Sequence, residues 1–199
     1  MTTSGATIWF TGLSGAGKST LSSMLAEKLD SRDIRHVDLD GDELRRGLNS
    51  DLGFSREDRT ENVRRAGEVA LLFARHGLIS LVSLIAPYTD ERRHVRERHV
   101  ESGVPFILVH VATSLQVCES RDPKGLYARA RRGEIEHFTG ITDPYEAPTA
   151  AELVVNTAGQ SPEESAERVL SLMVADGLID ADVLTAAAIR ADGGPDVGE

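Results

Sequence analysis

The chain of 199 residues lacks the features of membrane and disulfide-linked proteins. A bilayer span needs about 20 consecutive apolar residues, and one of the longest apolar stretches, residues 78–87, is interrupted by serines. The sequence does not open with a basic segment followed by an apolar one, so we expect no secretory signal. Cys118 is the sole cysteine, which excludes an intrachain disulfide and a cysteine metal cluster. These absences predict a cytoplasmic protein with no membrane partner.

Basic residues are also in the minority. The chain has 22 Lys and Arg against 32 Asp and Glu, a net charge of −10. Proteins that bind the nucleic-acid backbone normally carry a basic field, so we expect no nucleic-acid partner. An arginine-rich stretch over residues 45–65 still offers a place for a small anion. At about 150 residues per domain, we expect a single domain over residues 1–178 and an acidic, largely disordered tail over 179–199.

Short apolar runs alternate with segments of helical periodicity. The runs predict strands at residues 7–11, 35–39, 78–85, 106–111 and 152–155. The periodicity predicts helices at residues 19–29, 42–48, 55–76, 90–100, 115–120 and 162–174. This alternation is typical of an α/β fold, a doubly wound parallel sheet with helices on both faces.

Several single residues carry local expectations. Ser55 should cap the long helix after it, because an acid follows three residues on. His94 and His99 are expected on a solvated helix face, and Cys118 as a small buried residue. The inward face of the long helix should comprise Val63, Ala66, Val69, Ala70 and Phe73.

A glycine-rich phosphate-binding motif follows the first expected strand. Residues 12–19 read GLSGAGKS, which satisfies G-x-x-x-x-G-K-[ST], and a helix is expected directly after them. Backbone N–H groups of such a loop wrap around phosphate oxygens. We expect Lys18 to bridge the β- and γ-phosphates of a nucleotide and Ser19 to ligate Mg²⁺. The expected nucleotide-binding set is Gly12, Leu13, Ser14, Gly15, Ala16, Gly17, Lys18, Ser19 and Thr20.

Two absences narrow the class of nucleotide-binding protein. The sequence has no Asn-Lys-x-Asp motif, which a GTPase would carry. The apolar run at 78–85 continues into Ala86-Pro87, where a motor or ABC-type ATPase would place an acid. A small kinase that transfers the γ-phosphoryl group to a small molecule remains.

Acidic and basic residues after the second expected strand suggest an acceptor site. Asp40 and Asp42 should emerge at the sheet edge where the phosphate loop lies, and Asp40 suits a carboxylate beside the attacking hydroxyl. Alternatively, Asp40 and Asp42 only cap the helix that follows, and this capping role suits Asp42 better than Asp40. Arg59 and Asn62 share a helix face and, with Arg45, could hold an anion and a base or sugar. Taken singly, each arginine is more typical of an exposed surface residue than of a binding site.

Five sequence blocks carry a resemblance to a known family. They are DGDELRRGL at 40–48, DLGFS at 51–55, DRTENVRR at 58–65, RDPKGLY at 121–127, and FTGI at 138–141 with YEAP at 145–148. In this order they resemble the adenylylsulfate kinases, from about residue 6 to residue 172. Those enzymes phosphorylate adenosine 5′-phosphosulfate (APS) at the 3′-hydroxyl to give PAPS. The resemblance implies a P-loop NTPase fold, ATP with Mg²⁺ as donor, a homodimer, and an ATP sulfurylase as a candidate partner.

The resemblance also assigns roles to acceptor-site residues. It implies that Phe54 stacks on the APS adenine and that Phe138 closes over the same base, although without it both would be ordinary core residues. Ile85 would contribute backbone contacts. The remaining APS-binding residues would be Asp40, Asp42, Arg45, Arg59, Asn62 and Lys124.

On the donor side, the resemblance implies that Arg121 and Pro148 sandwich the ATP adenine. Residues 122–141 would form a small mobile lid that excludes water, with Lys124 reaching the reacting phosphates. The catalytic residues would be Lys18, Asp40 and Lys124. Many family members have serine where this chain has Ala86, and that serine can carry phosphate, so a phosphoenzyme at this position is excluded here.

Three hypotheses follow from the sequence. The first is an ATP- and Mg²⁺-dependent APS kinase in sulfate assimilation. The second is a diverged kinase for another nucleotide-like acceptor, with the phosphate loop intact. The third is a non-catalytic nucleotide-binding subunit of a sulfate-activating complex, which would bind ATP without turnover.

Overall fold

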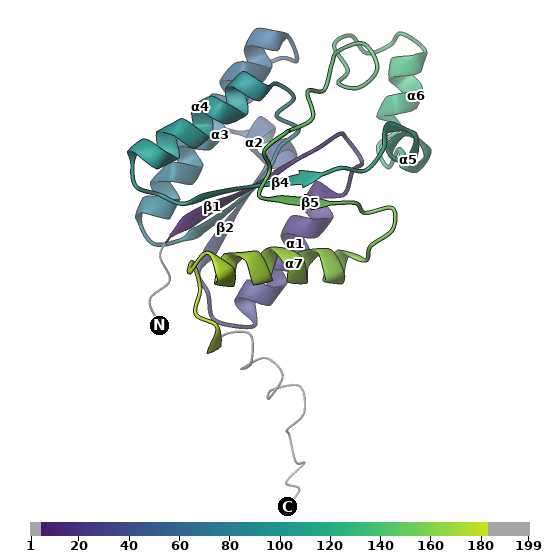
Figure 1. Ribbon diagram of the computed structural model, residues 1–199. Helices are drawn as coiled ribbons and strands as arrows, with labels where there is room; N and C mark the ends of the chain where they lie inside the picture. The colour runs from purple at the N-terminus through teal and green to yellow at the C-terminus, as the bar shows by residue number, and fades with distance from the viewer. Residues whose placement is uncertain (1–4, 183–199) are drawn as a thin grey trace, which may run out of the picture.

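A five-stranded parallel sheet forms the centre of the protein, of which a computed structural model describes residues 5–182. The strand order is β2-β3-β1-β4-β5, and every neighbouring pair is parallel (Figure 1). The doubly wound sheet predicted from the sequence is therefore confirmed. The strands are β1 Ala6–Thr11, β2 His36–Asp40, β3 Ile79–Ser83, β4 Phe106–Val111 and β5 Leu153–Val155.

Helices cover both faces of this sheet (Figure 1). Helices α1 and α7 pack together and share one apolar cluster with the side chains of Ile8 and Phe10. Helices α3 and α4 pack together on the other face, against Trp9 and Val82. The helices are α1 Lys18–Asp30, α2 Gly41–Arg46, α3 Arg56–Arg75, α4 Thr89–Glu101, α5 Leu115–Arg121, α6 Leu126–Arg131 and α7 Pro162–Ala175.

Helix α3 begins where the sequence predicts. The Ser55 hydroxyl accepts a hydrogen bond from the backbone N–H of Asp58, which satisfies one of the free N–H groups of the first turn. The expectation that Phe73 faces inward is wrong, since 36% of this side chain is exposed. Leu71 and Ala74 are buried instead, at 4% and 3% exposure. With 3.6 residues per turn, Phe73 lies at the edge of the buried stripe rather than at its centre.

His99 is buried, contrary to the expectation of a solvated helix face. Its exposed fraction is 0%, and its Nε2 lies 2.9 Å from the Thr7 hydroxyl. Its Nδ1 lies 2.8 Å from the Val95 carbonyl oxygen, and burial lowers the pKa of the imidazole. A neutral ring with both nitrogens partnered thus joins α4 to β1. His94 is exposed and Cys118 is buried, as expected.

The apolar core includes residues that follow α7. Gly177 adopts a φ of 67° after α7 and reverses the chain direction. Leu178 and Ile179 follow it, are 3% and 2% exposed, and join the apolar cluster under α1 and α7. Ile179, the first residue of the expected tail, is therefore a core residue. The remainder of the expected tail from residue 183 lies outside the described residues. Within residues 5–182, no helix is both long and apolar enough to cross a membrane.

Candidate active site

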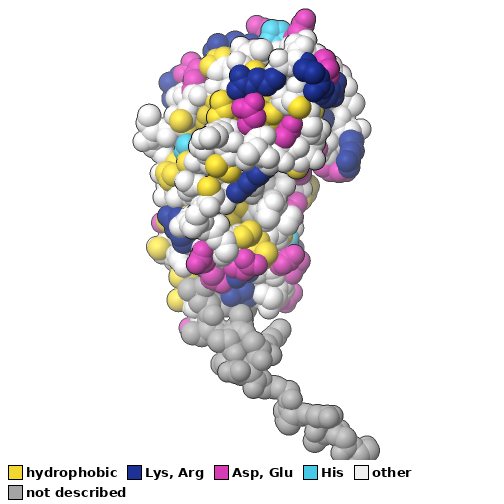
Figure 2. All heavy atoms as spheres, turned by 90° about the vertical axis from the view of Figure 1, so that its right-hand side faces the viewer, with side chains coloured by type: hydrophobic (Ala, Val, Ile, Leu, Met, Phe, Trp, Pro, Cys, Tyr) yellow, Lys and Arg dark blue, Asp and Glu magenta, His cyan; other side chains and the backbone are white. Residues whose placement is uncertain are grey.

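A cavity of about 1230 Å³ opens at the carboxyl edge of the sheet. Its wall includes the phosphate loop after β1, the start of α2, Ser83 at the end of β3 with the residues up to Pro87, and the segment between α5 and Thr139. Strands β1 and β3 are neighbours, so the loops that follow them meet at this edge. Figure 2 views the side that carries α5 and α6, where basic and acidic side chains surround exposed apolar ones.

The phosphate loop has the geometry that its glycines predict. Gly17 adopts a φ of 102° at the N-terminus of α1, a conformation that a side chain would strain. A Cβ added at Gly12 would lie 2.5 Å from the carbonyl oxygen of Val111, so the loop can approach β4 only without one. The Lys18 ammonium donates to the carbonyl oxygens of Gly12 and Leu13, at 2.9 and 2.8 Å. Burial lowers the pKa of Lys18 to about 8, although Asp40 and Asp42 favour its charged form.

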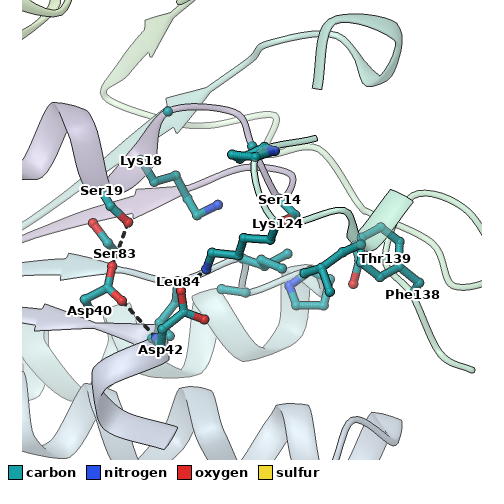
Figure 3. Close-up of a pocket in the computed structure, with 18 of the residues that line it drawn as sticks. Ser14, Lys18, Ser19, Asp40, Asp42, Ser83, Leu84, Lys124, Phe138 and Thr139 are labelled. Carbon is teal, nitrogen blue, oxygen red and sulfur yellow. Dashed lines mark hydrogen bonds and ion pairs between the residues drawn. The ribbon is translucent and has the colours of Figure 1, made fainter. Parts of the chain in front are cut away.

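Asp40 lies between the phosphate loop and the residues predicted to bind the acceptor. One of its carboxylate oxygens accepts from the Ser19 hydroxyl at 2.6 Å (Figure 3). The other accepts from the backbone N–H of Asp42 at 2.9 Å, which makes Asp40 the N-cap of α2. The capping role is therefore real, but it belongs to Asp40 rather than to Asp42 as the sequence favoured. A single carboxylate thus contacts both the phosphate loop and the segment that leads to the acceptor residues.

Asp42 and Lys124 form an ion pair across the cavity (Figure 3). Both side chains are more than half exposed, so the pair is solvated. Lys124 belongs to the turn between α5 and α6, whereas Asp42 lies in the first turn of α2. The contact therefore joins the segment after α5 to the start of α2 across the cavity.

The predicted acceptor residues lie together around an aromatic ring. Phe54 is 55% exposed and lines the cavity. The guanidinium groups of Arg45 and Arg59 lie 4.3 and 5.5 Å from the centre of its ring. Arg59 is only 8% exposed and donates to the carbonyl oxygens of Phe54 and His137, so its interpretation as an isolated surface arginine is wrong. Burial lowers the pKa values of both arginines, and their mutual repulsion also lowers that of Arg45.

Asn62 and Phe138 complete this side of the cavity. Asn62 is 6% exposed, and its side-chain oxygen accepts from the Asn49 amide at 3.0 Å. Phe138 is 8% exposed and meets the Tyr127 ring edge-on, with 4.9 Å between ring centres. Phe138 is thus both a core residue and part of the wall, whereas the exposed Phe54 is not a core residue.

On the donor side, the guanidinium of Arg121 donates to the hydroxyl and carbonyl oxygens of Thr157, both at 2.8 Å. Thr157 and Gln160 line the cavity after β5, and the sequence interpretation missed them. Their position at the carboxyl end of a strand was the signal that could have found them. Pro148 is not among the residues of the cavity wall.

Ile85, predicted to contact the acceptor through its backbone, lines the cavity, and its carbonyl oxygen accepts from the Thr11 hydroxyl at 2.6 Å.

The donor side also suits a magnesium ion. The hydroxyl of Ser19 and the carboxylate of Asp40 are hard oxygen ligands in direct contact with each other. In the described part of the chain, no group of three or more His, Cys, Asp or Glu side chains could hold a metal ion. This sparse set suits Mg²⁺, which usually takes one or two carboxylates together with substrate phosphates.

The parallel sheet, the phosphate loop between β1 and α1, and a charged subsite across the same cavity define a P-loop kinase. A family model described as adenylylsulphate kinase matches residues 4–156. The chain belongs to the adenylylsulfate kinase family.

Relatives and solved structures agree with this assignment. An adenylyl-sulfate kinase from Paraburkholderia xenovorans is 53% identical over 88% of this chain and 96% of its own length. A structure of the Mycobacterium tuberculosis APS kinase in complex with AMPPNP and APS has a TM-score of 0.83 and 48% identity, covering 85% of this chain and 97% of that chain. A hexameric APS kinase from Thiobacillus denitrificans has a TM-score of 0.68 and 36% identity, covering 89% of this chain but 30% of that chain.

Proposed function

We propose that the protein transfers the γ-phosphoryl group of ATP to the 3′-hydroxyl of APS and releases PAPS and ADP. The observation that carries this proposal is one cavity that joins a phosphate loop to an arginine-lined subsite with an exposed aromatic ring. The relative from Mycobacterium tuberculosis, whose structure contains AMPPNP and APS, has a similar fold. A donor and an acceptor that are both nucleotides need two such subsites.

In the proposed reaction the donor is held by the phosphate loop. Its backbone N–H groups and the N-terminus of α1 bind the phosphates, and the Lys18 ammonium turns from the carbonyl oxygens of Gly12 and Leu13 toward them. Magnesium, when bound, neutralises charge on the phosphate oxygens, and Ser19 and Asp40 are the residues that would hold it. Arg121 packs on the adenine, held in place by Thr157.

The acceptor is held on the opposite side of the cavity. Phe54 offers an exposed ring face on which an adenine can stack, and Phe138 limits the space on the other side of the base. The guanidinium groups of Arg45 and Arg59 supply positive charge for the phosphosulfate. Asp42, Asn62 and the backbone of Ile85 complete the contacts with APS.

Asp40 is the residue that we assign to the proton of the acceptor. The 3′-oxygen attacks the γ-phosphorus, its proton passes to the Asp40 carboxylate, and the bond from phosphorus to ADP breaks. The contact between Asp40 and Ser19 supports this role, because Ser19 ends the phosphate loop that would bind the donor phosphates. Asp40 therefore aligns the two substrates as well as accepting the proton.

Residues 122–141 act as a lid in this proposal. The ion pair between Lys124 and Asp42 links the lid to α2 across the cavity. With both substrates bound, Lys124 turns from Asp42 toward the transferred phosphoryl group, and the closed lid excludes water that would otherwise hydrolyse ATP.

The surroundings of the protein belong to the same proposal. We propose that it acts as a homodimer in the cytoplasm, with an ATP sulfurylase as a candidate partner that supplies APS. Light scattering of the purified chain should give twice the monomer mass of 21.5 kDa. A monomer or a hexamer would contradict the homodimer.

The test of this function is ADP release from ATP and Mg²⁺ with APS, with adenosine 5′-monophosphate, and with no acceptor. We expect release that depends on APS. Release with another acceptor only would favour the diverged kinase. ATP binding without release under any condition would favour the non-catalytic subunit.

A further inference from the structure

Ser83 carries a buried hydroxyl that has no hydrogen-bond partner. It is the last residue of β3, is 4% exposed, and lies in the cavity wall. In the sheet it is paired with Phe10 of β1 and with Asp40 of β2. Figure 3 shows it beside Ser19 and Asp40, at the base of the donor side. A buried hydroxyl without a protein partner takes its partner from a ligand or from water in the cavity.

The other serine of this strand shows what a structural hydroxyl does. Ser80 is fully buried, and its hydroxyl donates to the carbonyl oxygen of Ala70 at 2.9 Å. Successive side chains of a strand point to opposite faces, so Ser80 and Ser83 face opposite sides of the sheet. Ser80 joins β3 to α3, whereas Ser83 joins nothing in the described structure and lies next to the phosphate loop.

The position of Ser83 in the fold indicates which ligand it serves. In P-loop ATPases, Mg²⁺ is held by the serine or threonine of the loop and by an acid at the end of an apolar strand. Strand β3 is that kind of strand, and it neighbours β1. Here it ends in Ser83 instead of an acid, and the carboxylate comes from Asp40 at the paired position of β2. In this protein the carboxylate therefore lies on β2, as Asp40, and the residue at the end of the apolar strand β3 is the neutral Ser83.

We propose that Ser83 is a positioning residue for the magnesium ion, through a hydrogen bond to a water molecule that the ion carries. Ser19 and Asp40 hold the ion, and the Ser83 hydroxyl orients its water shell from the base of the cavity. This proposal rests on one part of the proposed function, the binding of a nucleotide together with Mg²⁺. It does not depend on the identity of the acceptor.

The test compares Ser83→Ala with Ser80→Ala in the full chain. Calorimetric titration with ADP at increasing Mg²⁺ gives the Mg²⁺ concentration at which nucleotide affinity reaches half its maximum. Residues that support metal ligands typically change metal affinity by about 10-fold to 100-fold when removed. We expect Ser83→Ala to raise this concentration about 10-fold and Ser80→Ala to leave it unchanged.

Thermal unfolding without nucleotide separates this role from a structural one. Ser83→Ala removes a hydroxyl that has no protein partner, so its Tm should stay close to that of the wild type. Ser80→Ala removes a hydrogen-bonded one, so its Tm should fall.

Wild-type Mg²⁺ dependence in Ser83→Ala would overturn the proposal, as would an equal shift in both variants. Nucleotide binding that ignores Mg²⁺ in the wild type would also overturn it. None of these titrations contains APS, so a failure of the acceptor assignment would leave their results unchanged.

Discussion

Replacing Asp40 by asparagine separates its catalytic charge from its structural role. The wild-type carboxylate accepts from the Ser19 hydroxyl at 2.6 Å and from the Asp42 N–H at 2.9 Å. Asparagine keeps one oxygen that can cap α2, and it is as good an N-cap as aspartate. Alanine keeps none and should cost about 1 kcal/mol of unfolding free energy. In a domain of this size that loss lowers Tm by about 2–4 °C.

The catalytic loss should be much larger than the structural one. A positioned general base typically contributes about 10²-fold to 10⁴-fold, so Asp40→Asn should lower kcat at least about 100-fold while Tm stays near the wild-type value. The assay is ADP release with saturating ATP, Mg²⁺ and APS, alongside the affinity for ADP. Asp38→Asn is the matched control, because Asp38 lies on the same face of β2 and accepts from the Ser22 hydroxyl at 2.8 Å. If Asp40→Asn turned over within a few-fold of the wild type, the assignment of the proton to Asp40 would be wrong.

Three further predictions address the two subsites. Phe54→Ala should raise KM for APS about 10-fold, because the stacking on the base is lost, and it should barely change Tm, because the ring is 55% exposed. Phe138→Ala leaves a cavity at a buried position and should lower Tm. Equal losses of Tm in the two variants would refute this difference between the two rings. Arg121→Ala should weaken ATP binding about 10-fold but not the binding of inorganic triphosphate, which lacks the base; equal losses would contradict the adenine contact. The pKa of Lys18 is about 8 in the free protein, so its ammonium loses its proton as pH rises from 7 to 9. The affinity for ADP should fall over the same range. An affinity that does not change between these pH values would show that Lys18 stays charged.

The strands and helices were predicted well, because the spacing of apolar residues that marks each of them involves only residues close together in the sequence. The Ser55 cap and the buried runs of β1, β3 and β4 are examples. The errors concern packing between distant segments. His99 is buried because Thr7 and Phe106 lie against it, which the charged sequence around it could not indicate. Ile179 joined the core because a turn at Gly177 returns the chain to α7.

The site was predictable in part for the same reason. The phosphate loop is a continuous sequence motif, so its lysine and serine could be identified without a structure. The cap role of Asp40 and the contact between Arg121 and Thr157 join segments far apart in the sequence. No periodicity signals such contacts, and Ser83 was overlooked because only the structure shows that its hydroxyl lacks a partner.

The measurement that tests the account most directly uses ATP labelled in its γ-phosphate, together with APS, Mg²⁺ and the full chain. The account predicts that the label leaves ATP and appears at the 3′-position of APS, as shown by the mass and the phosphorus NMR spectrum of the product. It also predicts no label on the protein, because Ala86 has no hydroxyl to carry phosphate. Label in free phosphate alone, or on a different acceptor atom, would contradict the proposed arrangement of Asp40 between the two substrates.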